Sequence, residues 1–166
     1  VLLGAMIAIF LLGWYVYFAM TGDPGEVCDL TEIEGIPALV ERCVEALRGL
    51  DGLVNAAGVF QTRELLEITP ADFDRIFAIN VRGLFFLQQA AARHMASAGG
   101  GSIVNVSCIH GHGGLPPRAA YAAAEGAVIA ITRELAVEWR DKGISVNAVA
   151  PSLIEAPQPV NISEYT

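Results

Sequence analysis

The sequence predicts an α/β fold, with a parallel sheet flanked by helices. Beyond residue 26, short apolar runs typical of buried strands alternate with long amphipathic helices. One unit, residues 102–130, contains a β-branched strand, a Gly/Pro-rich loop and an Ala-rich helix that carries Tyr121. Ligands of parallel sheets bind beyond the carboxyl ends of the strands. This unit therefore marks a candidate site.

Composition limits the function classes. The 166 residues are enough for one domain, and the net charge is −8 with acidic residues spread along the chain. Nucleic-acid-binding proteins concentrate Lys and Arg, so no nucleic-acid partner is predicted. The three cysteines have no CxxC spacing, which favours a reduced, cytoplasmic protein.

Residues 1–20 form an uncharged apolar segment, followed by the turn-like sequence Thr-Gly-Asp-Pro-Gly at 21–25. The segment predicts an apolar N-terminal helix that is long enough to cross a bilayer, with Trp14, Tyr15 and Tyr17 near one end. A membrane-associated helix and a buried helix, or a strand–helix pair, both remain open. The expected division is an apolar segment with linker at 1–25 and an α/β domain at 26–166.

The expected elements follow from periodicity and capping signals. Thr31 with Glu34, and Thr69 with Pro70 and Asp72, are predicted helix starts. In chain order the pattern predicts a strand within 26–30, a helix from 31 to about 48, a strand at 50–54, a helix from 70 towards 95, a strand at 103–107, a helix from 118 or 119 to about 139 and a strand at 144–149. Three strand ends, at 55–58, 107–108 and 150–152, carry small or polar residues. Small residues let a flat ligand approach the backbone closely.

Four ordered motifs resemble the short-chain dehydrogenase/reductase family. Residues 50–58 resemble its Asn-Asn-Ala-Gly strand end, and 79–81 its mid-helix asparagine element. Residues 102–107 and 144–151 resemble the strands before its catalytic serine and its Pro-Gly turn. The resemblance implies a partial Rossmann-type, doubly wound sheet, NAD or NADP as cofactor and hydride transfer between a small-molecule alcohol and a ketone. It also implies a homo-oligomer, because in the family the helices carrying Asn80 and Tyr121 pair with a second subunit.

The resemblance assigns catalytic positions residue by residue. Tyr121 matches the tyrosine that takes the hydroxyl proton, and Asn80 matches the asparagine that holds a relay water. Cys108 stands at the serine position, thirteen residues before Tyr121, and Glu125 stands at the lysine position, four residues after it. A lysine there lowers the pKa of the tyrosine, whereas a carboxylate raises it. We therefore expect weakened hydride-transfer chemistry.

The resemblance also implies a cofactor surface along the strand ends. Before Asp29 the sequence has no glycine-rich turn opening a helix, which the family uses for the pyrophosphate. The positions implied to contact the cofactor are Asp29, Leu30, Asn55, Ala56, Ala57, Gly58, Pro151 and Ser152.

Two functions remain open on the sequence. The first is an oxidoreductase of the short-chain type. The second is a catalytically silent relative or truncated product that self-associates, with or without membrane attachment through residues 1–20. No metal site is predicted, because His110 and His112 lack a carboxylate or a cysteine pair at ligand spacing. Approach of His110 to Cys108, which would make the thiol a nucleophile, has no support in the sequence.

Overall fold

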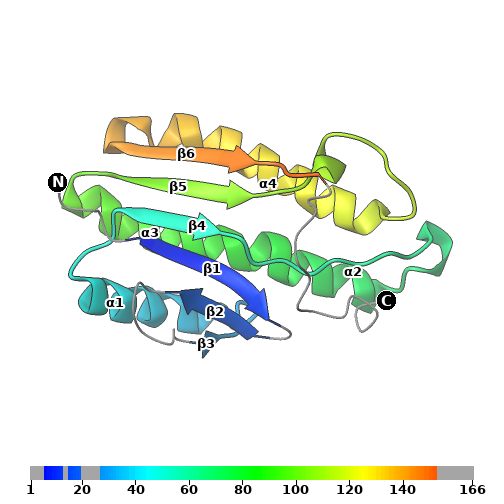
Figure 1. Cartoon of the computed structure of the whole chain (residues 1–166), viewed down its shortest axis with the longest axis horizontal. Helices are drawn as coiled ribbons and strands as arrows, with labels where there is room; N and C mark the ends of the chain where they lie inside the picture. The colour runs from blue at the N-terminus through cyan, green and yellow to red at the C-terminus, as the bar shows by residue number, and fades with distance from the viewer. Residues whose placement is uncertain (1–5, 13–14, 20–26, 153–166) are drawn as a thin grey trace.

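The computed structural model describes residues 6–12, 15–19 and 27–152, with side chains from residue 28 onward. The described strands form a single sheet in the order β3-β2-β1-β4-β5-β6 (Figure 1). Strands β1, β4, β5 and β6 run parallel, and β2 is antiparallel to both of its neighbours. Their bounds are β1 Met6–Leu12, β2 Tyr15–Ala19, β3 Val27–Cys28, β4 Gly52–Asn55, β5 Gly101–Val106 and β6 Ile144–Val149. The predicted parallel α/β sheet of Rossmann type is confirmed, with an antiparallel hairpin added to it.

The connecting helices lie together behind the sheet (Figure 1). Each of the connections β3–β4, β4–β5 and β5–β6 advances the chain in the same direction across the sheet. Right-handed crossovers in one direction place their helices on the same face. The helices are α1 Ile36–Leu47, α2 Pro70–Phe77, α3 Leu84–Ala98 and α4 Ala119–Glu138.

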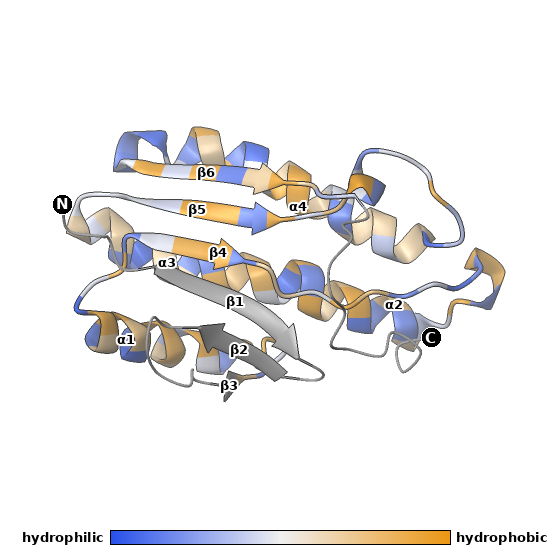
Figure 2. Cartoon of the chain, viewed as in Figure 1, coloured by the Kyte–Doolittle hydropathy of each residue, from blue (hydrophilic) through white to orange (hydrophobic). Residues whose placement is uncertain are grey.

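The core lies between this helix layer and one face of the sheet. Along the strands, buried and more exposed residues alternate, so that Leu53, Ile103 and Val146 are buried against the helices. On the other face, the hydroxyls of Ser102 and Ser145 are exposed and hydrogen-bond each other across the two strands, 3.0 Å apart. Figure 2 shows hydrophobic residues along β4 and β5 and a mixture of hydrophobic and hydrophilic residues around α1.

The predicted apolar N-terminal helix is wrong. Residues 6–12 and 15–19 form strands β1 and β2, and β1 lies between β2 and β4 in the sheet. A continuous apolar run fits a buried strand as well as a helix, so periodicity alone could not separate them. In the part of the chain that the structure describes, we find no helix with the length and apolar character needed to span a membrane. The predicted linker, 21–25, lies outside the described residues.

The first connecting helix begins later than predicted. Thr31 does not cap it, because its backbone N–H and its hydroxyl both donate to Asp29 Oδ1 at 2.8 Å. This Asx-type turn is followed by a 3₁₀ turn at Ile33–Gly35, and α1 begins at Ile36 with Pro37 in its first turn. The side-chain bond to Asp29 therefore competes successfully with helix capping.

The second helix begins as predicted. The Thr69 hydroxyl accepts from the Asp72 N–H, while the Asp72 carboxylate accepts from the Thr69 N–H, which is a complete capping box. The expected single helix contains a π-helical segment, Ala78–Gly83, between α2 and α3. Such segments are frequent at functional sites. This one carries Asn80.

Gly83, the last residue of the π-helical segment, packs closely against Leu30, which lies two residues after β3. A Cβ built on Gly83 would lie 2.8 Å from the Leu30 Cβ and 2.9 Å from its carbonyl oxygen. We expect Gly83→Ala to lower the free energy of unfolding by about 1–3 kcal/mol in urea titrations, because backbone must move to make room. Gly113→Ala is the matched control, since a Cβ there meets nothing within 4 Å. Equal stability of the two variants would contradict the packing argument.

Candidate active site

The candidate catalytic residues meet at the carboxyl edge of the sheet, around the first turns of α4. Tyr121 and Glu125 are four residues apart on α4, so they share one face. Asn80, from the π-helical segment, donates through Nδ2 to Glu125 Oε1 at 3.3 Å. The side chains of Cys108 and Glu125 lie close enough to the Tyr121 phenol to raise its pKa. The structure thus brings together all four residues that the sequence placed in the catalytic group.

Asn80 also fixes the segment that follows β4. Its Oδ1 accepts from the Val59 N–H at 2.7 Å, and its Nδ2 donates to the Val59 carbonyl at 3.0 Å. A Cβ built on Gly58 would lie 3.4 Å from Asn80 Nδ2. Asn80 is 2% exposed, so this amide is a buried structural link between the end of β4 and Glu125.

Cys108 belongs to a second group of hydrogen-bonded side chains near Tyr121. Its Sγ lies 3.0 Å from His110 Nδ1, and Arg118 Nη1 lies 3.0 Å from His110 Nε2. Ser107, the neighbouring residue, points the other way and donates its hydroxyl proton to the Glu125 carbonyl at 3.1 Å. Successive residues of an extended strand point to opposite sides, which accounts for the opposite orientation of Ser107 and Cys108.

Aromatic side chains complete this side of the site. The Phe60 and Tyr121 rings meet edge to face with centroids 5.0 Å apart, and the His110 ring meets Tyr121 at 5.7 Å. The Arg118 guanidinium lies 5.0 Å above the Phe60 ring. Phe60 is 43% exposed, so these rings border an open surface.

The surroundings of Tyr121 keep its phenol protonated. Burial raises the pKa of Tyr121 far above its ordinary value, and the neighbouring Glu125 and Cys108 side chains raise it further. Burial also raises the pKa of Glu125, while the hydrogen bond from Asn80 partly opposes that rise. Tyr121 is therefore a neutral hydrogen-bond donor in this structure.

His110 is neutral, and its tautomer follows from its neighbours. Burial first, and then the nearby Arg118 charge, lowers the pKa of His110. A guanidinium can only donate, so His110 Nε2 must accept from Arg118 and the ring proton must sit on Nδ1. The Nδ1–H group then donates to Cys108 Sγ.

The positions implied for the cofactor are only partly accessible. The side chains of Leu30 and Asn55 are each 2% exposed, and Asn55 Nδ2 donates to Asn105 Oδ1 at 2.8 Å within the core. Those two residues can therefore offer only backbone atoms to a ligand. The more accessible positions are Asp29, Ala56, Ala57, Gly58, Pro151 and Ser152.

In the part of the chain that the structure describes, no element matches the pyrophosphate part of a dinucleotide. Only two residues separate β1 from β2, so no helix N-terminus follows β1. Among the described residues, Asp29 at the position predicted for the adenine end is exposed, and Tyr121 at the position predicted for the nicotinamide end is partly exposed. The described residues place no helix N-terminus after β1 for the pyrophosphate. The described residues also contain no cluster of three or more His, Cys, Asp or Glu side chains arranged to hold a metal ion.

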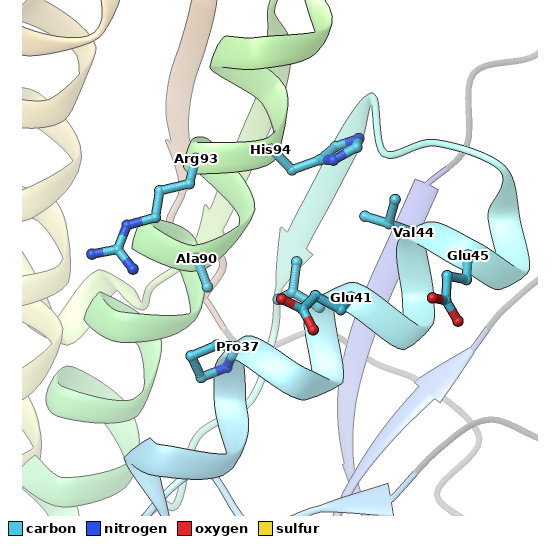
Figure 3. A pocket seen from close by; sticks show the side chains of 8 residues that line it. Pro37, Glu41, Val44, Glu45, Ala90, Arg93 and His94 are labelled. Atoms are coloured by element: carbon cyan, nitrogen blue, oxygen red, sulfur yellow. The ribbon is translucent and has the colours of Figure 1, made fainter.

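A separate groove lies on the helix layer between α1 and α3 (Figure 3). Its volume is about 470 Å³, and Glu41 and Glu45 of α1 and Arg93 and His94 of α3 are among its lining residues. None of the predicted site residues lines it. It is therefore distinct from the Tyr121 site.

Comparison with known proteins agrees with this geometry. The sequence profile described as short chain dehydrogenase matches residues 25–165. The chain belongs to the short-chain dehydrogenase family. It is 39% identical over 124 residues to 2-dehydro-3-deoxy-D-gluconate 5-dehydrogenase of Escherichia coli, covering 74% of this chain and 49% of that relative. This member of the short-chain dehydrogenase family thus spans about half the length of that relative.

Solved structures show the same fold. An NAD⁺-bound xylitol dehydrogenase superposes with a TM-score of 0.77 at 33% identity, over 80% of this chain and 51% of that one. A gluconate 5-dehydrogenase from Burkholderia cenocepacia, in complex with NADP and tartrate, superposes with a TM-score of 0.74 at 32% identity, over 78% and 51% of the two chains.

Sequence reasoning missed the contacts of His110 and Arg118. The available signals were spacing alone: His110 follows Cys108 by two residues, and Arg118 precedes Tyr121 by one helical turn. Neither spacing predicts that the loop between β5 and α4 folds so that His110 contacts both Cys108 and Arg118. Only the folded loop shows these contacts.

Proposed function

We propose that this chain is an NAD(P)-dependent oxidoreductase of the short-chain type that acts on a small-molecule alcohol or ketone. With Tyr121 protonated, the site favours carbonyl reduction, in which the phenol donates a proton. The observation that carries the proposal is the neutral Tyr121 phenol, which is partly exposed beside Cys108 and held against Glu125. The NADP- and NAD-bound structures that share its fold support the cofactor class.

The residues present supply the proton side of this chemistry. Reduction of a ketone leaves an alkoxide-like oxygen, which is more basic than a phenolate and so can take the Tyr121 proton. The Cys108 thiol, at the serine position, can orient the same oxygen as a weak donor. A bound NAD(P)H would supply the hydride. Asn80 holds the Tyr121 region to the β4 end through its bonds to Glu125 and Val59.

The reverse reaction needs a base that this site rarely contains. Alcohol oxidation requires the phenolate, and the nearby Glu125 carboxylate opposes a second negative charge. The phenolate fraction then rises about tenfold for each pH unit, because the Tyr121 pKa stays above the accessible range.

The pH profiles test this proposal. We expect ketone reduction to be nearly independent of pH around neutrality, and alcohol oxidation to rise about tenfold per pH unit without a plateau. Rates are followed by NAD(P)H absorbance with a panel of small ketones and polyols, and Tyr121→Phe is the control that removes the proton donor. A plateau in oxidation near pH 7 would show that Tyr121 already acts as a base and would overturn the assignment.

Cofactor binding is measured separately, by titrating the protein with NADH and NADPH and following their fluorescence. Saturable binding of either supports the proposal. If neither cofactor binds, the chain is a catalytically silent family member, and the lack of a pyrophosphate contact explains the absence of binding. Self-association through α3 and α4, which the family resemblance implies, stays a prediction that sedimentation equilibrium can measure.

A further inference from the structure

Cys108, His110 and Arg118 form a connected group that the proposed hydride transfer does not require. A nucleophile, a hydrogen-bonded imidazole and a third group that orients the imidazole are the elements of a covalent catalytic site. Here the Arg118 guanidinium fixes the His110 tautomer, and His110 Nδ1–H points at Cys108 Sγ from 3.0 Å. Cys108 is partly exposed, so small molecules can reach the thiol.

The loop that carries the group is held firmly against α4. A Cβ built on Gly111 would lie 2.8 Å from the Glu125 carbonyl carbon and 2.8 Å from Ile129 Cδ1. The Ile109 N–H donates to the Pro151 carbonyl, and the Gly111 N–H donates to the Cys108 carbonyl. The sulfur and imidazole are therefore set in place by backbone contacts.

A donor for a developing oxyanion stands next to the sulfur. The neutral Tyr121 phenol lies beside Cys108, whose side chain raises the phenol pKa, and the Tyr121 and His110 rings meet with centroids 5.7 Å apart. The oxygen of an adduct on Sγ would be two bonds from the sulfur. Arg118 adds positive charge beyond His110, and its Nε is buried without a hydrogen-bond partner in the described structure. Donors placed around a nucleophile in this way stabilise negative charge on a tetrahedral adduct.

We propose that Cys108 is the nucleophile of a carbonyl-addition site that captures aldehydes as thiohemiacetals. Sγ forms a bond to the carbonyl carbon, and the π electron pair of the carbonyl moves to oxygen. That oxygen gains a proton as the thiol loses one, with solvent as carrier. Nothing is oxidised or reduced, so neither a cofactor nor another reactant is needed. Tyr121 donates a hydrogen bond to the adduct oxygen, and His110 is a positioning residue that holds Sγ.

The first test uses iodoacetamide on the full-length protein, with peptide mapping of the three cysteines. We expect Cys108 to be alkylated about tenfold faster than Cys28, the other partly exposed thiol, and buried Cys43 to be slowest. His110→Ala should slow Cys108 about tenfold, the factor of one charge-assisted hydrogen bond, and His110→Asn should restore most of the rate by returning an N–H donor. Equal rates at Cys108 and Cys28 would overturn the proposal. Equal alkylation rates of Cys108 in His110→Ala and in the natural protein would show that His110 does not position the sulfur.

The second test uses propionaldehyde, with 1-propanol as the matched control. Propionaldehyde should slow alkylation of Cys108 saturably and 1-propanol should not, and an aldehyde labelled at its carbonyl carbon should give a thiohemiacetal NMR signal that is absent in Cys108→Ser. Tyr121→Phe should weaken aldehyde protection about tenfold. If propionaldehyde does not protect Cys108 from alkylation, or if the NMR signal is absent, the proposal is wrong, whatever the cofactor titrations show.

Discussion

Glu125→Lys is expected to restore a phenolate at Tyr121 and to raise alcohol oxidation near neutral pH by about tenfold or more. The substitution replaces a negative neighbour by a positive one at the same place on α4, and each unit by which the Tyr121 pKa falls raises the phenolate fraction about tenfold. Two measurements check this expectation. One is the near-ultraviolet absorbance of the phenolate against pH, corrected with Tyr121→Phe, and the other is the rate of NAD(P)⁺ reduction.

The absorbance measurement needs no cofactor, so it separates two causes of low activity. A lowered Tyr121 pKa without gain of oxidation would point to the missing pyrophosphate contact. An unchanged Tyr121 pKa would contradict the electrostatic account itself.

Glu125→Gln is the matched control, because it removes the charge and keeps the shape. The folded-state pKa of Glu125 is raised above its ordinary value, so above about pH 4.5 the folded state binds more protons than the unfolded state. The stability of the natural protein therefore falls as pH rises through that window. Because glutamine does not titrate, the stability advantage of Glu125→Gln should grow with pH and then level off. A constant difference across pH would show that Glu125 is not the group responsible.

Asn105→Ala is expected to lower the free energy of unfolding by about 3 kcal/mol, the second large effect. Asn105 is fully buried under the helix layer, where it accepts from Asn55 Nδ2 at 2.8 Å and donates to Thr132 Oγ1 at 2.9 Å and Gln88 Oε1 at 3.2 Å. Truncation leaves these buried partners unsatisfied and opens a cavity between β5, α3 and α4. Urea unfolding followed by circular dichroism measures the loss.

Ser102→Ala is the control for this network. Ser102 lies on the same strand and also makes a side-chain hydrogen bond, but it is exposed on the other face. We expect its removal to change stability by less than about 0.5 kcal/mol. Similar losses of unfolding free energy in both variants would show that burial of the Asn105 network does not add to stability.

The sequence predicted best the elements whose signals are local. The strand at Ile144–Val149 and the helix Ala119–Glu138 appear within about a residue of their predicted bounds, because alternation and helical spacing are clear there. The Thr69 capping box is likewise contained in four consecutive residues. Where two local signals compete, as at Thr31, the sequence does not show that the Asp29 carboxylate takes the hydroxyl first.

The apolar N-terminal segment shows the opposite case. Whether such a run forms a helix or strands depends on the partner that covers its backbone, and here β4 provides a parallel partner for β1. Each residue of β1 pairs with a residue 46 positions further along the chain, as Met6 does with Gly52, so no window of local sequence contains the partner.

For the active site, the sequence by itself determined which residues are available: Tyr121 and Glu125 one turn apart on a helix, Cys108 at a strand end and Asn80 on another helix. Helix periodicity alone places a carboxylate beside the phenol, which is why a raised Tyr121 pKa could be predicted. Only the tertiary structure decided that His110 contacts both Cys108 and Arg118, and that Asn80 binds both Glu125 and the segment after β4. Those contacts join loops and helices that the backbone brings together only when the sheet forms.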